Sequence, residues 1–229
     1  MLETTGLYLY AYLVGAVPTA YLIGRWTKGI DIRKYGSGNV GATNLAQHVG
    51  RTWVAPLLLF EILAKGASPI LVGQYLLGLE QTSVFLVLAP LAAVAGHNWS
   101  AFLHFQGGRG VIVIGGALLA LSPLLLSLAI AVFLVGWALT RSSGVWVLLS
   151  LFSLPLWALA LDKWVLAINN QSALIWFYAG SVTLMVLKRL LSNWQPLPLD
   201  LPKGQVLLNR LLLDRDVARR ADWVGRIPG

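Results

Sequence analysis

Long apolar segments separated by short polar ones make up the first 190 residues or so of the chain. The apolar segments occupy residues 6–24, 53–78, 82–96, 111–140, 145–161 and 172–187. Crossing a hydrocarbon core of roughly 30 Å takes about 20 helical residues, so 111–140 is too long for one crossing. Ser122-Pro123 divides it into two short helices. The pattern predicts an all-α integral membrane protein with about seven transmembrane helices.

The composition agrees with this fold class. Of the 229 residues 57% are hydrophobic and 11% are charged, whereas a soluble domain carries roughly 25% charged residues. The chain has no cysteine, which excludes disulfides, thiolate ligands and a cysteine nucleophile. A net charge of +8 suits a nucleic-acid ligand, but here the basic residues alternate with apolar segments. We therefore expect contact with anionic membrane lipids and no nucleic-acid partner.

The distribution of positive charge predicts the orientation. If the polar segments alternate between two sides, one side receives all 17 Lys and Arg residues except Lys65, within an apolar segment, and Lys163, on the other side. The positive-inside rule makes the rich side cytoplasmic, with an outside N-terminus and a cytoplasmic C-terminus. We expect a polytopic membrane domain over residues 1–187. Residues 188–229 form a basic, proline-broken cytoplasmic tail, whose amphipathic stretch 206–217 suits the membrane surface.

Two glycine-rich segments fall on the predicted cytoplasmic side, within the loops 25–52 and 97–110. The first reads GSGNVGATN over residues 36–44, and the second reads GGRG over residues 107–110. Glycine lets backbone N–H groups approach an anion, and a guanidinium binds phosphate oxygens through two parallel hydrogen bonds. Together the two loops predict a phosphate site. A simple turn, with Arg109 marking the cytoplasmic side, also accounts for the second segment.

Few other side chains in the chain suggest chemistry. His97 is suited to act as a general base or to hydrogen-bond a substrate. Only His104 stands near it as a second metal ligand, so we expect no metal and no cofactor. Ser37 lacks a nucleophile-elbow pattern and a neighbouring base, so a covalent serine mechanism is not indicated. Glu61 and Lys65 stand four residues apart in an apolar segment, where they serve either as a structural ion pair or in function.

These segments resemble the first two motifs of the PlsY-type acyl-phosphate:glycerol-3-phosphate acyltransferases. The resemblance rests on residues 36–44, on Gly96-His97 and on residues 105–111. It implies a seven-span enzyme of the bacterial inner membrane with its active face in the cytoplasm, in agreement with the charge distribution. It also implies transfer of a fatty acyl group from acyl-phosphate to glycerol 3-phosphate, giving lysophosphatidic acid in phospholipid synthesis.

The resemblance also assigns roles to individual residues. Ser37, His97 and Arg109 would be catalytic. The residues that would bind phosphate and orient the acceptor are Gly36, Gly38, Asn39, Gly41, Thr43, Asn44, Gly107, Gly108 and Gly110. An acyl-phosphate is already activated, so positioning and charge neutralisation can supply most of the rate.

Departures from the family pattern motivate two other hypotheses. Gln47 and Gln106 stand where the family has cations, and its third motif, His-Arg-x-Asn, is not recognisable in residues 187–193. A catalytically silent or altered-acceptor relative would bind a phosphorylated lipid precursor or partner an active enzyme. A small transporter would use Glu61 and Lys65 to line a pathway, although the sequence has no internal repeat.

Overall fold

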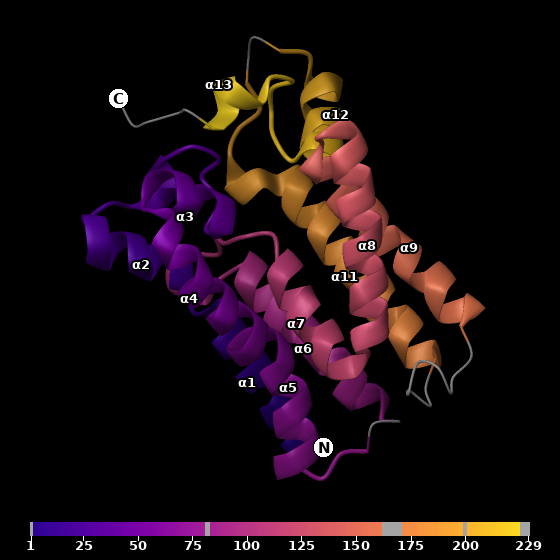
Figure 1. Ribbon diagram of the computed structural model, residues 1–229. Helices are drawn as coiled ribbons and strands as arrows, with labels where there is room; N and C mark the ends of the chain where they lie inside the picture. Colours follow the sequence, from indigo (N-terminus) through magenta and orange to yellow (C-terminus); the bar gives the residue numbers. More distant parts are fainter. Residues whose placement is uncertain (1, 81–82, 162–170, 199–200, 225–229) are drawn as a thin grey trace.

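A computed structural model of the protein describes residues 2–80, 83–161, 171–198 and 201–224, and all regular elements in these ranges are helices (Figure 1). The predicted connection around Lys163 lies outside the described residues. Two apolar helices are of intermediate length, Val84–Asn98 and Val111–Leu121. The segments long and apolar enough to cross a membrane are Leu2–Lys28, Arg51–Leu76, Pro123–Thr140, Ser143–Ala160 and Ser172–Leu191. An all-α, multi-pass membrane architecture is thus confirmed for the described part.

The first apolar segment is divided, although the sequence predicted one span over residues 6–24. Helix α1 (Leu2–Ala16) ends before Pro18, and α2 (Thr19–Lys28) begins after it. Proline has no N–H to continue the hydrogen-bond ladder, so the helix breaks there. The Ala16 carbonyl at this break accepts a hydrogen bond of 2.5 Å from the Ser100 hydroxyl. A contact between distant residues therefore stabilises the break.

The second apolar segment is a chain of short helical pieces: α4 (Val54–Leu59), η3 (Phe60–Ala67), α5 (Ser68–Leu71) and η4 (Val72–Leu76). The pieces η3 and η4 are π-helical, a geometry that is frequent at functional sites. A Cβ added to Gly66 of η3 or to Gly116 of α7 (Val111–Leu121) would overlap the backbone of the facing helix. Because both residues are glycine, η3 and α7 pack at backbone contact.

The chain from residue 111 to 140 forms two helices, as Ser122-Pro123 predicted. Helix α7 ends at Leu121, and α8 (Pro123–Thr140) begins with Pro123 in its first turn. Proline is tolerated at that position because the first N–H groups of a helix have no acceptor within it.

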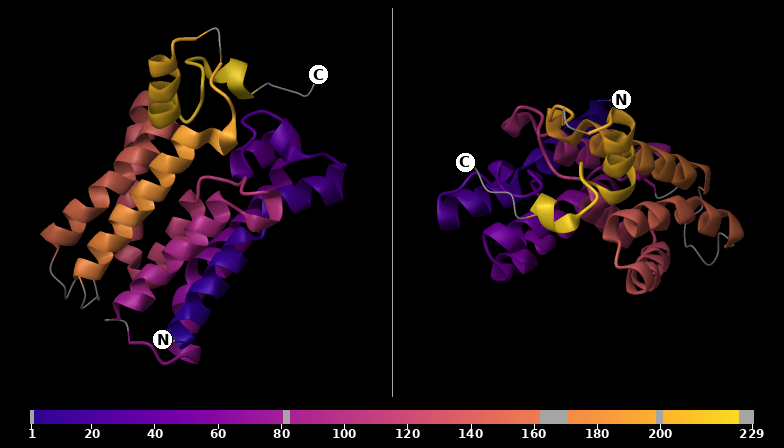
Figure 2. Two further views of the ribbon diagram at one scale, coloured as in Figure 1. Left: turned by 180° about the vertical axis from the view of Figure 1, so that it is seen from behind. Right: turned by 90° about the horizontal axis from the view of Figure 1, so that it is seen from above.

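The remaining long helices pack against one another. Helix α1 packs on α6 (Val84–Asn98), α8 packs on α9 (Ser143–Ala160), and α11 (Gln171–Leu191) contacts both α6 and α9. Their shared core contains Val87, Leu118 and Phe177, all fully or almost fully buried. Large apolar side chains such as Leu156 and Trp176 face outward, as in a protein surrounded by lipid. The N-terminus lies at the opposite end of the molecule from α3 (Ala42–His48) and the C-terminal helices (Figures 1 and 2).

The C-terminal segment folds onto the helices beside it. After the 3-10 turn η6 (Ser192–Trp194), it forms α12 (Lys203–Leu213) and α13 (Arg220–Val224). Helix α12 packs against α9 and α11. Its Arg210 donates a hydrogen bond to the Leu190 carbonyl and pairs with Asp216 at 2.6 Å. The predicted amphipathic helix therefore exists, but its buried face contacts protein helices.

Candidate active site

The two glycine-rich loops meet at one cavity of about 350 Å3. Gly36, Gly38 and Gly107 belong to the same loops but do not line this cavity. Nine of the twelve predicted site residues line the cavity: Ser37, Asn39, Gly41, Thr43, Asn44, His97, Gly108, Arg109 and Gly110. The fold thus brings together two polar segments that stand about 70 residues apart in the sequence.

The first loop takes its shape from two glycines and one asparagine. Gly36 and Gly38 have φ angles of 50° and 69°, which favour glycine. The side-chain amide of Asn44 is buried and donates to the carbonyls of Ile32, Tyr35 and Asn39 at 3.0–3.1 Å. The Asn44 amide nitrogen therefore holds the loop in place, which leaves Ser37, Asn39 and Thr43 to present polar groups to the cavity.

A direct contact joins the base of the first loop to the second loop. Arg33 Nη1 donates to Gln106 Oε1 at 3.1 Å, while Arg33 Nη2 lies 2.7 Å from Asp31 Oδ2. The hydrogen bond from Arg33 lowers the pKa of the Asp31 carboxyl below its usual value. The hydrogen bond to Asp31 in turn raises the pKa of the Arg33 guanidinium. Gln106, which stands where the family has a cation, thus serves here as the acceptor for an arginine of the other loop.

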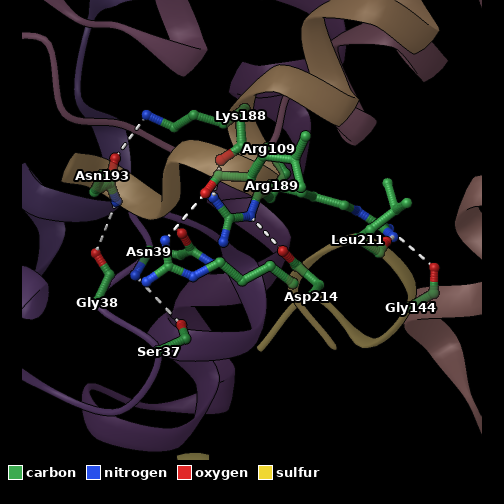
Figure 3. Close-up of polar contacts among 12 residues, drawn as sticks. Ser37, Gly38, Asn39, Arg109, Gly144, Lys188, Arg189, Asn193, Leu211 and Asp214 are labelled. Atoms are coloured by element: carbon green, nitrogen blue, oxygen red, sulfur yellow. Dashed lines mark hydrogen bonds and ion pairs between the residues drawn. The ribbon is translucent and has the colours of Figure 1, made fainter. Parts of the chain in front are cut away.

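A third segment, at the C-terminal end of α11, contacts both glycine-rich loops. Asn193 Oδ1 accepts a hydrogen bond from Gly107 N at 3.0 Å, and Asn193 Nδ2 donates to the carbonyls of Gly107 and Gly38 at 3.1 and 3.3 Å. Lys188 Nζ donates to Asn193 Oδ1 at 2.6 Å and to the Asn98 carbonyl. Figure 3 shows Asn193 between the Lys188 ammonium and the Gly38 carbonyl. The third motif was not recognisable in the sequence of residues 187–193, yet two side chains of this segment contact the loops.

The spacing of these two residues differs from that of the expected His-Arg-x-Asn motif, so the motif was not recognisable in the sequence. Lys188 lies in α11, whereas Asn193 lies in the following turn with a φ of 56°. This left-handed turn brings Asn193 back toward Lys188, so a Lys and an Asn five residues apart contact each other. Asparagine tolerates this backbone conformation better than most residues. The only signal in the sequence was a Lys, an Arg and an Asn close together at the end of a predicted span.

Arg109 is held from two sides at the edge of the cavity. Its Nε lies 2.6 Å from Asp214 Oδ1, and its Nη1 donates to the Lys188 carbonyl at 2.9 Å (Figure 3). The side chain is only 10% exposed. Among the described residues its Nη2 has no protein acceptor, so this end of the guanidinium remains available to an anion. The sequence identified Arg109 but gave no indication of Asp214.

His97 belongs to a buried cluster of ionisable groups. Glu61 Oε1 pairs with Lys65 Nζ at 2.7 Å, and Glu61 Oε2 lies 2.8 Å from His97 Nδ1. Within the described chain Oε2 has no aligned hydrogen bond, so its contact with Nδ1 is a short-range electrostatic one. A Cβ at Gly108 would overlap His97 Nε2, so the glycine leaves room for that nitrogen at the cavity wall. The predicted ion pair exists, and it also contacts His97.

Another part of the cavity wall is apolar. It comes from four helices, with Leu57 in α4, Val111 and Ile112 in α7, Phe133 in α8 and Val147 in α9. The cavity thus joins hydrogen-bonding loops to a hydrocarbon surface, and it suits a ligand that is charged at one end and apolar at the other.

Comparisons with known proteins agree with this geometry. The family model described as Glycerol-3-phosphate acyltransferase matches residues 5–197. Glycerol-3-phosphate acyltransferase 4 of Dehalococcoides mccartyi (strain CBDB1) is 36% identical over 216 residues, which cover 94% of this chain and 90% of that protein.

Solved structures show the same relationship. The crystal structure of PlsY, an integral membrane glycerol 3-phosphate acyltransferase, in its glycerol 3-phosphate form superposes with a TM-score of 0.71 at 27% identity. The lysophosphatidic acid form of PlsY gives a TM-score of 0.70 at 26% identity, and in both cases the match covers 82% of this chain and 88% of the other. The predicted resemblance is confirmed, and the chain belongs to the glycerol-3-phosphate acyltransferase family.

Proposed function

We propose that the protein transfers a fatty acyl group from acyl-phosphate to glycerol 3-phosphate, giving lysophosphatidic acid and inorganic phosphate. One observation carries the proposal: a single cavity joins two glycine-rich loops and the Arg109 guanidinium to an apolar wall. Both substrates carry a phosphate, and the donor also carries an alkyl chain. The loops provide backbone N–H groups and a cation for phosphate, and the apolar wall suits the chain next to the acyl carbonyl.

The reaction needs no covalent intermediate on the protein. The acceptor hydroxyl attacks the acyl carbonyl carbon, the bond from that carbon to the phosphate oxygen breaks, and inorganic phosphate leaves. His97 Nε2 accepts the hydroxyl proton, while Glu61 beside Nδ1 stabilises the imidazolium. Arg109 neutralises the leaving phosphate, and Ser37, Asn39 and Thr43 orient the substrates. Positioning and charge neutralisation supply the acceleration because the donor is already activated.

We also propose the membrane arrangement that the charge distribution predicts. The chain crosses the bacterial inner membrane about seven times, with its N-terminus outside and its C-terminus in the cytoplasm. Residues 1–187 are the membrane domain, and residues 188–229 are the cytoplasmic tail. The position of the cavity supports this proposal, since its lining includes loop residues and the C-terminal residues Leu213 and Asp214, all on the predicted positive side.

Acyl transfer by the purified protein in lipid tests the function. Palmitoyl-phosphate and labelled glycerol 3-phosphate are supplied, and lysophosphatidic acid and phosphate are measured together. We expect equal amounts of both products, and a large loss of both with Arg109→Ala. A folded wild-type protein that forms neither product, beside an active family member, would contradict the proposal. Phosphate release without acyl transfer to glycerol 3-phosphate would instead point to a different acceptor.

A further inference from the structure

We propose that Asp214 is a positioning residue of the active site, whose carboxylate orients the Arg109 guanidinium toward the substrate phosphate. The inference rests on the proposed role of the cavity in binding phosphate. Asp214 lies in the C-terminal segment, beyond residue 197 where the match to the family model ends. The C-terminal segment would therefore contribute a functional side chain to this enzyme.

The geometry around Arg109 supports this role. Asp214 Oδ1 contacts Nε at 2.6 Å and the Lys188 carbonyl accepts from Nη1 at 2.9 Å, so two acceptors on different nitrogens fix the plane of the guanidinium. Phosphate recognition by arginine depends on that plane, because the two parallel hydrogen bonds are directional. Asp214 and Arg109 both line the cavity, so the contact lies where the ligand would bind.

Contacts of two buried arginines fix the backbone from which the Asp214 side chain extends. Arg189 is buried at the end of α11, and it donates to the carbonyls of Leu211 and Gly144 at 2.7 and 2.9 Å (Figure 3). Arg210 ties the same helix, α12, to the Leu190 carbonyl and to Asp216. Asp214 caps the C-terminal end of α12 with a φ of 57°. Two buried arginines thus set the position from which Asp214 reaches Arg109.

Two opposing effects decide whether loss of the Asp214 carboxylate weakens or strengthens phosphate binding. A carboxylate near a phosphate repels it, which would weaken binding. However, the Asp214 side chain is 24% exposed, and solvent screens charges at such a position. A free arginine loses rotamer entropy when it binds, and Asp214 removes most of that cost by holding the side chain in advance. We therefore expect that loss of the carboxylate weakens phosphate binding.

Two substitutions test the role without disturbing the backbone. Asp214→Asn removes the charge, and Asp214→Gly removes the side chain, while both residues accept a left-handed conformation. Asp222→Asn, on the exposed side of α13, removes the same charge elsewhere in the segment and serves as the control. Binding of inorganic phosphate is measured by calorimetry in lipid nanodiscs. In parallel, KM and kcat are measured for both substrates, and thermal unfolding is recorded for each variant.

We expect both Asp214 variants to raise the dissociation constant of phosphate, and the KM of at least one substrate, by about tenfold. We expect kcat to fall by less than KM rises, because the Lys188 carbonyl still holds Nη1 of Arg109 when the carboxylate is lost. Asp222→Asn should match wild type. In an Arg109→Ala background the effect of Asp214→Asn on phosphate binding should disappear, because the residue acts through Arg109.

Unchanged or tighter phosphate binding in the Asp214 variants would overturn the proposal, as would an equal effect in the Arg109→Ala background. The binding measurement separates this inference from the proposed reaction. If Asp214→Asn weakens phosphate binding through Arg109 while the wild type shows no acyl transfer, the positioning role holds and the proposed function fails.

Discussion

The side chain of Asn193 pairs with both backbone groups of Gly107, accepting from its N–H at 3.0 Å and donating to its carbonyl at 3.1 Å. The same Nδ2 also donates to the Gly38 carbonyl at 3.3 Å in the other loop. One buried amide therefore sets the distance between the two glycine-rich loops.

Asn193→Ala should lower both stability and activity. It leaves the buried N–H of Gly107 without its acceptor, at a cost of roughly 1–3 kcal/mol, and it releases the loops from each other. We expect kcat/KM to fall by about 100-fold, since small displacements of positioned groups have effects of this size. Thermal unfolding and acyl transfer are measured together. Asn209→Ala is the matched control, because its amide donates to the Asp216 carbonyl and neither residue lines the cavity.

Gly108→Ala should abolish most activity while the protein still folds. A Cβ there would overlap both His97 Nε2 and the Val40 carbonyl, so the imidazole and the first loop have to move. We expect kcat to fall by about 100-fold or more, the range of general-base catalysis. Gly115→Ala, in α7, meets only an ordinary contact of 3.8 Å with Leu126 and should remain active. Wild-type turnover by Gly108→Ala would contradict a role for His97.

Substitutions at Glu61 and Lys65 separate pairing from catalysis. Glu61→Gln leaves the buried Lys65 without its counter-ion, so we expect a lower unfolding temperature together with a 10- to 100-fold lower kcat. Replacing both residues, as Glu61→Gln with Lys65→Met, should recover stability because no unpaired charge remains. If Glu61 assists His97, the double variant stays slow. Recovery of turnover along with stability would mean that the pair is purely structural.

The contact between Asp31 and Arg33 should make the free energy of unfolding depend on pH. Arg33 lowers the pKa of Asp31 in the folded protein, so the unfolded chain binds more protons as the pH falls. The stabilisation is complete above about pH 4, the ordinary range for aspartate, and is lost as the pH falls through the lower folded value. Unfolding midpoints of wild type and Asp31→Asn should converge in that window. Asp222→Asn, at an exposed position of α13, is the control.

The sequence predicted local features of this fold and missed those that depend on contacts between distant residues. Ser122-Pro123 marked a real division between helices because proline acts on its own turn. Residues 36–44 and 107–110 marked the cavity because glycine-rich polar loops stand out in an apolar chain. Pro18 divides the predicted first span, and the Ala16 carbonyl at the break accepts a hydrogen bond from the Ser100 hydroxyl, 84 residues away. That contact cannot be inferred from local pattern.

The same distinction applies within the site. Arg109 and His97 could be predicted because they sit beside conspicuous motifs. Asp214 is 105 residues from Arg109, and Asn193 is 86 residues from Gly107. Both depend on how α11 ends and α12 turns back, which periodicity does not encode. Lys188 and Asn193 contact each other through a left-handed turn, which a search for a contiguous motif does not detect.

Helix α7 has 11 residues and rises roughly 16 Å, about half the thickness of a hydrocarbon core. It starts directly after the Arg109 loop and packs along η3, which carries Glu61. In the proposed orientation we expect a helix this short to place the cavity, at its N-terminal end, below the headgroups. The donor can then offer its carbonyl to the cavity while its alkyl tail stays among the lipids. Only the small acceptor has to travel from the aqueous phase, so lateral diffusion in the leaflet delivers one substrate and water delivers the other.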